Sequence, residues 1–167
     1  MLILLGKPAS GKTTIANMIA EMYSLNVVSF GVILREKAKT DKEIADVVNS
    51  GGLVNDTQAL SILNEYVHND PNVLIDGYPR QMSQAKLLNE GLINKVIELS
   101  CKDENVLNRC ASRGRHDDDE TTVNKRLKVY YDQSKEVIDY YESQGKLFTI
   151  DASLPIELVF SQVKKIM

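Results

Sequence analysis

The segment Leu2–Thr14, with the sequence LILLGKPASGKTT, contains the residue types that bind phosphate groups. It has an apolar run, then Gly6, four further residues, and then Gly11, Lys12 and Thr13. Glycines let a loop bend so that its N–H groups point inward at a helix start, where the helix dipole also attracts anions. The lysine adds charge for the outer phosphates, and the hydroxyl suits Mg²⁺. The spacing is that of the Walker A loop; a glycine-rich turn before an ordinary helix is the alternative interpretation.

A second group of candidate residues follows the apolar run in VLIDGYPRQMSQA, residues 73–85. Asp76 ends the run, Gly77 and Pro79 turn the chain, and Arg80 follows. Ligands of parallel sheets bind beyond the carboxyl ends of the strands, so we expect Asp76 beside the phosphate loop. There it can hold Mg²⁺ directly or through water, while Arg80 can bind a phosphate with two hydrogen bonds. The alternative is a common strand-to-helix turn with an exposed arginine.

Four arginines form a third group. Arg109 and Arg113 share one helix face, Arg115 lies in the loop that follows, and Arg126 belongs to the next helix. Phosphoryl transfer needs positive charge around the moving group, which these side chains can supply; a solvated basic face is the alternative. We interpret the acidic residues 117–120 as the N-cap and first-turn charges of the next helix. Four consecutive side chains cannot all face one metal ion.

The composition of the chain limits the classes of protein to which it can belong. The chain has 167 residues, 43% of them hydrophobic, and a net charge of −3, which fits one globular domain and gives no basic excess for nucleic acid. No apolar run has membrane-spanning length, so we expect a cytoplasmic protein. We also expect a monomer. Cys101 and Cys110 lack metal-ligand spacing and are expected to be buried free thiols. His68 and His116 are expected at the surface or in loops.

Apolar periodicity gives the elements that must position these residues. We expect strands over residues 2–5, 26–29, 72–76, 95–99 and 147–151. We expect helices over residues 13–23, 32–40, 42–50, 56–69, 83–89, 103–112 and 120–143, with a last helix from Pro155. Strands that alternate with helices predict an α/β fold, a P-loop three-layer α/β/α sandwich around a five-stranded parallel sheet, in one domain over residues 1–167.

Some positions within these helices are predicted more closely. In the first helix, Ile15, Met18, Ile19 and Met22 have the spacing of one buried face. Asp56 is placed as the N-cap of the fourth helix. The long helix over 120–143 carries an apolar stripe made of Val123, Leu127, Tyr130, Val137, Ile138 and Tyr141.

Six motifs occur in the order GKPASGKTT, SFGVILR, GGLV, DGYPRQMSQ, RCASRGRHDDDETTVNKRL and TIDASLP. In this order the chain resembles the adenylate kinase family of nucleoside monophosphate kinases, over nearly its whole length. The resemblance implies Mg²⁺-dependent transfer of the γ-phosphoryl group of ATP to a nucleoside monophosphate. It also implies a helical acceptor-binding segment at about 30–70 and a minimal, vestigial lid at about 113–118.

The resemblance also assigns roles to individual positions. The residues expected to bind ATP are Ala9, Ser10, Gly11, Lys12, Thr13, Thr14, Arg109 and Arg113. The residues expected around the monophosphate are Phe30, Gly31, Arg35, Gly52, Leu53, Val54, Gly77, Arg80, Gln84, Arg115 and Arg126, with Gln84 at the base. Those expected to act in catalysis are Lys12, Arg80, Arg109, Arg115 and Arg126. Thr13 and Asp76 are expected to hold the metal ion.

The sequence departs from the family pattern at several of these positions. Ala9 stands where a glycine is common, Phe30 where a threonine is common, Val32 where an aspartate is common, and Gly52 where a lysine is frequent. The short lid is expected to exclude water less well, which would favour ATP hydrolysis over transfer. Gln84 favours AMP or dAMP as acceptor, whereas the Phe30 ring and the missing side chain at Gly52 predict selectivity looser than is usual in the family. A UMP/CMP or deoxynucleotide kinase, a nucleotide-binding regulatory module with little turnover, and a small-metabolite kinase remain as alternatives.

Overall fold

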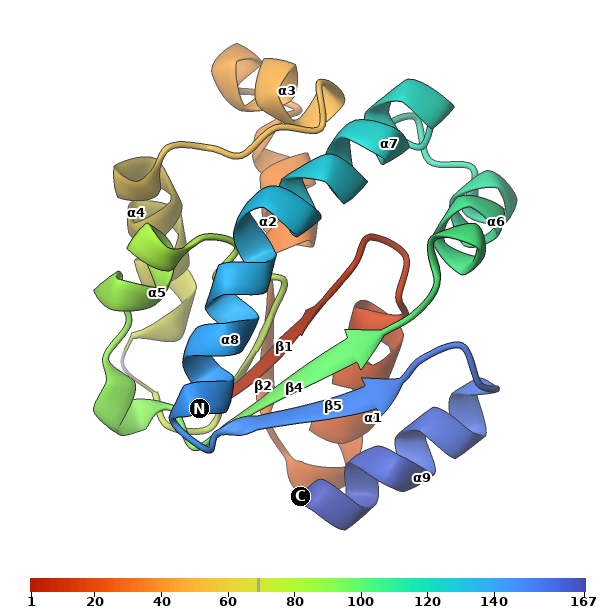
Figure 1. Cartoon of the computed structure of the whole chain (residues 1–167). Helices are drawn as coiled ribbons and strands as arrows, with labels where there is room; N and C mark the ends of the chain where they lie inside the picture. The colour runs from red at the N-terminus through yellow and green to blue at the C-terminus, as the bar shows by residue number, and fades with distance from the viewer. Residues whose placement is uncertain (69) are drawn as a thin grey trace.

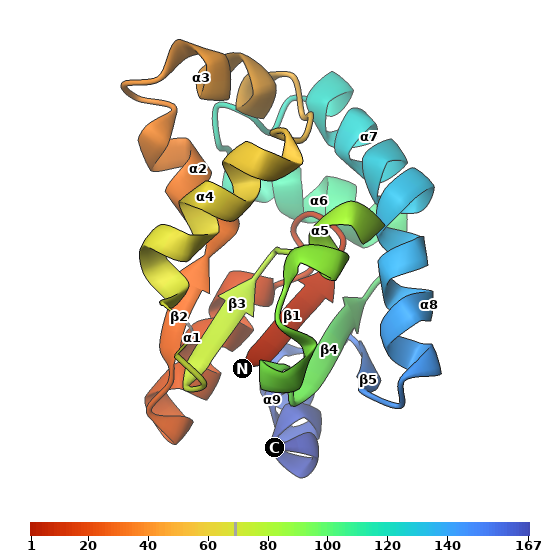
Figure 2. The same cartoon turned by 90° about the vertical axis from the view of Figure 1, so that its left-hand side faces the viewer.

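The apolar runs form one parallel sheet in the computed structural model, which describes residues 1–68 and 70–167. The strands are β1 (Leu2–Gly6), β2 (Asn26–Ser29), β3 (Val73–Asp76), β4 (Lys95–Ser100) and β5 (Leu147–Asp151). They lie in the order β2-β3-β1-β4-β5, which can be followed across Figure 2. The first strand is central, with Leu4 opposite Asp76 of β3 and Ile97 of β4. The predicted sheet is confirmed, with strand ends within one residue of those expected.

Helices connect the strands. The first five are α1 (Lys12–Tyr23), α2 (Phe30–Lys37), α3 (Lys42–Asn49), α4 (Asp56–Val67) and α5 (Met82–Leu87), followed by the short 3-10 turn η1 (Glu90–Leu92). After β4 come α6 (Asp103–Arg113), α7 (Glu120–Val129), the π-helical segment η2 (Tyr130–Ser134) and α8 (Lys135–Ser143). The last helix is α9 (Ile156–Ile166). The predicted helix over 56–69 ends at Val67, and its final position, Asn69, lies outside the described residues.

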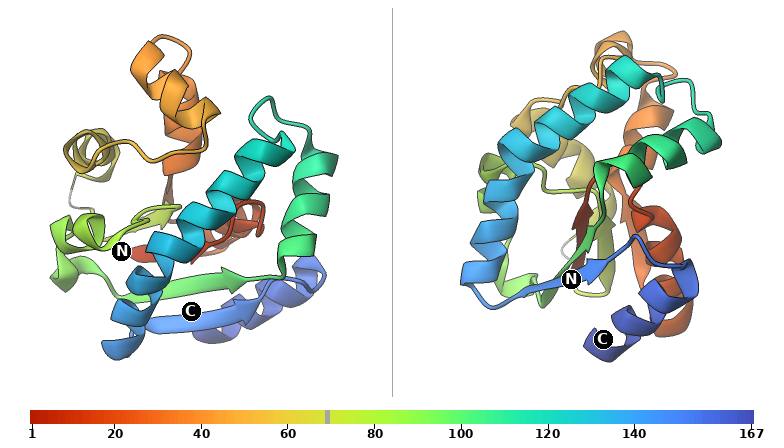
Figure 3. Two further views of the ribbon diagram at one scale, coloured as in Figure 1. Left: turned by 45° about the horizontal axis from the view of Figure 1, so that its top comes forward. Right: turned by 45° about the vertical axis from the view of Figure 1, so that its right-hand side comes forward.

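The two faces of the sheet carry separate apolar clusters. Side chains alternate along β1, so Ile3 and Leu5 pack in one cluster with α4, α5 and α8, whereas Leu2 and Leu4 pack in the other with α1 and α9. Figures 1 and 3 show these helices on opposite faces, with α2, α3, α6 and α7 standing beyond the carboxyl ends of the strands. The three-layer prediction is therefore confirmed, and the open end of the sheet lies between α2–α3 and α6–α7.

Two details of the helix predictions were wrong. Met22 is 52% exposed, and the buried face of α1 consists of Ile15, Ala16 and Ile19. Since Tyr23 is exposed as well, the last turn of α1 is simply not covered by other elements. In α4 the N-cap is Asn55, whose side chain accepts a hydrogen bond from the N–H of Gln58, and Asp56 is the first helical residue. Asparagine and aspartate both cap helices well, but only Asn55 has the extended backbone that directs a side-chain oxygen at the first turn of the helix.

The long helix predicted over 120–143 is interrupted by η2. Val123 and Leu127 before the interruption pack in the α1 cluster, whereas Val137 and Tyr141 after it pack in the cluster on the other face. An unbroken α-helix would keep one stripe on one side, so a wider turn is needed to redirect the apolar face. None of the helices within residues 1–68 and 70–167 has the length and apolar composition needed to cross a membrane.

Candidate active site

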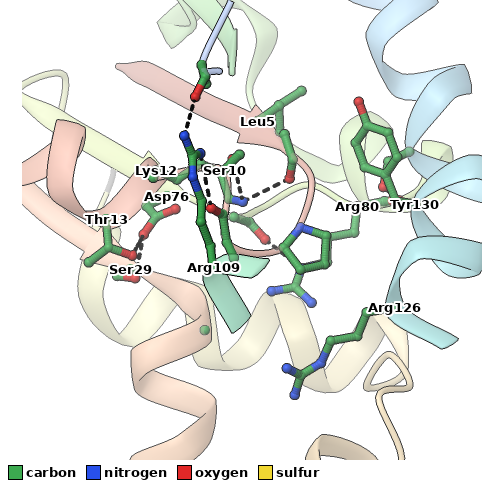
Figure 4. A pocket seen from close by; sticks show the side chains of 18 of the residues that line it. Leu5, Ser10, Lys12, Thr13, Ser29, Asp76, Arg80, Arg109, Arg126 and Tyr130 are labelled. Carbon is green, nitrogen blue, oxygen red and sulfur yellow. Dashed lines mark hydrogen bonds between the residues drawn. The ribbon is translucent and has the colours of Figure 1, made fainter. Parts of the chain in front are cut away.

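A cavity of about 550 Å³ lies at the carboxyl ends of the strands. Its walls come from the loop after β1, from α2, from the segment between α3 and α4, from the turn after β3, and from α6 and α7. It brings together the predicted residues Ala9, Ser10, Gly11, Lys12, Thr13, Thr14, Gly31, Arg35, Gly52, Leu53, Asp76, Gly77, Arg80, Arg109, Arg113, Arg115 and Arg126. Figure 4 shows several of them around the open space.

The loop between β1 and α1 wraps around the ammonium group of Lys12. Lys12 Nζ donates to the backbone oxygens of Gly6 and Lys7, at 2.8 and 2.7 Å, and to Ser10 Oγ at 3.4 Å. Gly6 has a φ of +139°, and a Cβ there would lie 2.4 Å from the backbone oxygen of Leu99, so only glycine fits. Burial lowers the pKa of Lys12 to about 8. A phosphate group entering this loop would therefore meet a buried cation that lacks an acidic partner within bonding distance among the described residues.

Asp76 lies at the floor of the cavity and is 3% exposed. Its Oδ2 accepts hydrogen bonds from Thr13 Oγ1 and from Ser29 Oγ, each at 2.7 Å. The expected place of Asp76 beside the phosphate loop is confirmed, whereas the part of Ser29 was missed. A signal existed, because Ser29 ends β2 directly opposite Asp76 in the register of the sheet.

These oxygens suit a hard cation. Mg²⁺ binds carboxylate and hydroxyl oxygens, keeps several waters and shares phosphate oxygens with a bound nucleotide. Among residues 1–68 and 70–167 no group of three or more His, Cys, Asp or Glu side chains could hold a metal ion. The small oxygen set at Asp76 and Thr13 thus fits Mg²⁺ that arrives with phosphate, and it does not fit a metal held by protein alone.

Arg80 is held by the turn that carries it. Its Nε donates to the backbone oxygen of Gly77 at 2.8 Å, and its own N–H donates to Gln84 Oε1 at 2.9 Å. Burial, and secondarily the positive charge of Arg126, lowers the pKa of Arg80 to about 10. Figure 4 shows the guanidinium groups of Arg80 and Arg126 projecting into the same region. Two partly buried cations that face one space mark a site for anions.

Arg109 lies beside the phosphate loop. Its Nη2 donates to the backbone oxygen of Ala152 at 2.7 Å, and its Nη1 donates to that of Ala9 at 3.5 Å. On the other side of the cavity, burial and the charge of Arg115 lower the pKa of Arg35. The interpretation of the arginines as a solvated basic face is therefore wrong for this set, because they converge on the cavity.

Two aspartates of the acidic run are ion-pair partners of these arginines. Asp117 is 1% exposed and bonds to Arg126, and Asp118 accepts hydrogen bonds from Arg113 at 2.6 and 2.8 Å. Burial raises the pKa of Asp117, but the bond to Arg126 and its charge outweigh burial and hold the pKa below its usual range. The prediction of solvated helix-start charges was wrong for this pair, because α6 and α7 each supply an arginine to the short connection between them.

The rest of the acidic run does what was expected. Asp119 is the N-cap of α7, with its side chain accepting from the N–H of Thr122 at 2.9 Å, and Glu120 is the first helical residue. Gly114 ends α6 with a φ of +60°. His68 and His116 are exposed, and Cys101 and Cys110 are buried free thiols, as predicted.

The end of α3 touches the start of α7 across the mouth of the cavity. Thr122 Oγ1 donates to the backbone oxygen of Asn49 at 3.1 Å, and Arg126 Nη2 donates to that of Val48 at 3.3 Å. Gly51 follows in a left-handed conformation, with a φ of +69°, and a Cβ there would lie 3.0 Å from the backbone oxygen of Thr122. This close approach brings the segment around Gly52 and Leu53 to the arginines of α7.

Three predicted site residues lie behind the cavity wall. Phe30 is 2% exposed, and the centroid of its ring is 5.2 Å from that of Tyr78 in the core. Val54 is buried in the same apolar cluster. Gln84 is buried too, and its side-chain oxygen faces the backbone of Arg80. None of the three lines the cavity, so the relaxed selectivity predicted from the Phe30 ring loses its physical basis.

Sequence reasoning also missed lining residues. Leu34, Val48 and Val129 supply apolar wall, and Tyr130 lines the cavity while its hydroxyl donates to the buried Glu98 at 2.6 Å. The apolar periodicity that predicted these helices gave no means of separating core-facing positions from pocket-facing ones.

Comparison with known proteins gives an independent view of the same chain. The family model described as adenylate kinase matches residues 4–146. The chain is similar to adenylate kinase 1 of Synechocystis sp., with 36% identity covering 99% of this chain and 95% of that protein. It is also similar to the adenylate kinases of Trichodesmium erythraeum, at 36% identity over 98% of this chain and 95% of that one, and of Prochlorococcus marinus, at 35% over 98% and 96%.

Proposed function

The chain belongs to the adenylate kinase family, and we propose that its cavity transfers the terminal phosphoryl group of ATP to AMP to give two ADP. One observation carries the proposal: a phosphate loop, an oxygen site at Asp76 and the arginines of five separate segments face one cavity of about 550 Å³. Two phosphate-bearing substrates placed end to end need that distribution of charge, since the transfer itself needs little covalent chemistry.

The loop after β1 is the proposed site for the ATP phosphates. Its N–H groups and the N-terminus of α1 attract anions, and Lys12 would exchange the backbone oxygens that it now contacts for phosphate oxygens. Thr13 and Asp76 would hold Mg²⁺, Asp76 directly or through water. When bound, Mg²⁺ neutralises charge on the β- and γ-phosphate oxygens.

The opposite wall is the proposed site for the acceptor. Arg35, Arg80 and Arg126 would bind the phosphate of AMP, and Gly31, Gly52 and Leu53 would line its nucleoside. Arg109 and Arg115 would stabilise the transferring group, where negative charge is spread in the transition state. Gln84 does not line the cavity, so we propose that it acts on the acceptor by holding the backbone of Arg80.

The chain divides into functional parts within one domain. We propose that residues 30–70 form the acceptor-binding segment and that the connection around 113–118 serves as a minimal lid, with Arg113 on the ATP side. The contact between Thr122 of α7 and the backbone of Asn49 ties the acceptor-binding segment to the helix that follows the proposed lid. The loss of an acidic residue at Val32, which is 41% exposed, leaves the metal site dependent on Asp76 and Thr13.

We propose further that the enzyme works as a monomer in the cytoplasm. The residues of the proposed site come from a single chain, and two buried free thiols suit a reducing compartment. Gel filtration at assay concentration tests the oligomeric state, and a dimer that is required for activity would contradict it.

A coupled assay of ADP formation tests the function. The value of kcat/KM is compared across AMP, dAMP, CMP, UMP, GMP and dTMP, with ATP and Mg²⁺ in excess and with chelator as a control. We expect AMP to give the highest value, with little ADP formed in the absence of acceptor. A pyrimidine nucleotide preferred over AMP would indicate one of the alternative kinases, and hydrolysis that no acceptor accelerates would indicate a module without transferase activity.

A further inference from the structure

Lys7 is a buried lysine that the proposed reaction does not use. The residue is 9% exposed, and its Nζ donates to Asp103 Oδ1 and to the hydroxyl of Tyr131, both at 2.6 Å. Burial lowers the pKa of Lys7, but the two hydrogen bonds outweigh burial and raise the pKa overall. The side chain is absent from the cavity lining, although both of its neighbours in the chain are present there. It therefore carries a charge that faces away from the substrates.

The contacts of Lys7 join three elements. Its backbone belongs to the phosphate loop, and its carbonyl oxygen accepts the hydrogen bond from Lys12 Nζ. Asp103 is the first residue of α6, and Tyr131 lies in η2, so the side chain fixes the loop to both. Tyr131 also donates to Asp103 Oδ1 at 2.8 Å, which closes the contacts into a triangle.

Both elements that Lys7 contacts lead to arginines of the cavity. Helix α6 carries Arg109, which contacts the backbone of Ala9 in the same loop. Segment η2 continues α7, which carries Arg126. The position of the loop relative to these arginines is thus set by the Lys7 triangle from outside the cavity. Transfer reactions are sensitive to such placement, since a misplacement of about 1 Å can cost about 100-fold in rate.

We propose that Lys7 is a positioning residue that holds the phosphate loop in alignment with the arginines of α6 and α7. The proposal rests on the proposed function. The side chain acts through the loop and the two helical elements, and it makes no contact with the reacting groups. Its loss should leave the N–H groups of the loop available to ATP, while the alignment of the bound phosphates with Arg109 and Arg126 is relaxed.

The test replaces Lys7 by Met, which keeps an apolar stem and removes the charge. Lys135→Met is the matched control, because Lys135 is an exposed lysine that pairs with Asp139 four residues later in the same helix, α8. We expect kcat with AMP to fall about tenfold in Lys7→Met, with the calorimetric Kd for ATP within about threefold of wild type. Lys7→Arg keeps the charge and donors, and we expect at least about a third of wild-type kcat.

Two milder variants form a cycle that does not depend on Lys7→Met folding. Asp103 and Tyr131 are about half exposed, so Asp103→Asn and Tyr131→Phe should fold. We expect each to lower kcat about two- to threefold, and the pair together to lower it less than the product of the two. Melting temperatures are measured for all variants, because a purely structural role would lower stability without changing kcat at temperatures where the protein is folded.

Several results would overturn the proposal. The proposal is overturned if kcat for Lys7→Met lies within about twofold of wild type. It is also overturned if the loss of kcat is matched by an equal weakening of ATP binding, because Lys7 would then only support the loop. If Lys7→Met does not fold, fully additive effects of Asp103→Asn and Tyr131→Phe would also reject it. Wild-type protein that transfers no phosphoryl group to AMP would reject the proposed function instead, so the two failures can be told apart.

Discussion

Replacing Asp117 by Asn removes the carboxylate that neutralises Arg126 inside the cavity. The side chain of Asp117 is fully buried and that of Arg126 is 16% exposed. Removal of one partner from a buried ion pair costs about 3–5 kcal/mol, because the remaining charge is left uncompensated. Arg126 retains the backbone oxygen of Val48, and Asp118 Oδ1 lies 3.6 Å from its Nη1. Because these contacts remain, we expect a loss at or below the lower end of that range, about 2–3 kcal/mol in the free energy of unfolding.

The same variant should change the dependence of stability on pH. The pKa of Asp117 in the folded protein lies below its ordinary value, because Arg126 outweighs the effect of burial. Its contribution to stability is therefore present above the unfolded-state pKa, at about pH 4, and is lost as the pH falls through the folded-state pKa. In Asp117→Asn this part of the acid sensitivity should be missing.

Urea unfolding at neutral pH and low ionic strength measures the loss, with Asp139→Asn as an exposed control expected to match wild type. Inorganic phosphate should then stabilise Asp117→Asn more than wild type, because the charge of Arg126 is no longer neutralised by a carboxylate and attracts an anion in the cavity more strongly. At about 100 times its Kd a bound anion adds about 2.7 kcal/mol. The reasoning is refuted if the variant lies within about 0.5 kcal/mol of wild type, or if phosphate stabilises both proteins equally.

Three further predictions concern other parts of the site. The pKa of Lys12 is lowered to about 8 in the free protein, so ATP affinity should fall as the pH rises above that value. Binding of ATP near this pH should also take up protons, which calorimetry in buffers of different ionisation enthalpy measures. Uptake that persists in Lys12→Met would contradict this. Arg80→Ala should lower kcat/KM at least about 100-fold. Its melting temperature should stay the same or rise, because the repulsion between Arg80 and Arg126 is relieved. An unchanged kcat/KM would mean that Arg80 has only a structural role. Phe30→Thr should lower the free energy of unfolding in urea by about 3 kcal/mol, because the Phe30 ring packs on Tyr78. The order of preference among acceptors should stay the same, and a changed order would indicate that the ring lies in the pocket.

The sequence predicts those parts of the site that depend on local backbone. Gly11 and Lys12 are adjacent to a strand and a helix that are recognisable from periodicity, and Asp76 follows directly from the end of another strand. The register of the parallel sheet places Asp76 opposite Leu4 of β1, and the loop that follows β1 then brings Thr13 within hydrogen-bond distance of Asp76. The sheet and its layers were predictable for the same reason.

The parts that could not be predicted depend on packing over long separations in the chain. Whether Phe30 faces the cavity or the core is decided by Tyr78, which is 48 positions away in sequence and is placed by a different turn. Asp117 looks like a helix-start charge until the position of Arg126 on the folded chain is known. In the sequence Lys7 looks like one variable position of a phosphate loop. Nothing in the sequence around Asp103 and Tyr131 indicates that these residues are its partners.

The π-helical segment η2 also constrains how the length of the chain can vary. Residues on a helix follow one another at about 100° around its axis, so each residue added or lost turns every later side chain by that angle. Deletion of one residue within Tyr130–Ser134 would rotate Val137 and Tyr141 out of the cluster that they now fill. The connection between Arg113 and Glu120 is an irregular loop with no helical phase to keep, although its Asp117 and Asp118 must still meet Arg126 and Arg113. Changes of length that keep these ion pairs should therefore be tolerated better before α7 than within η2, whose length sets the direction of the apolar face of α8.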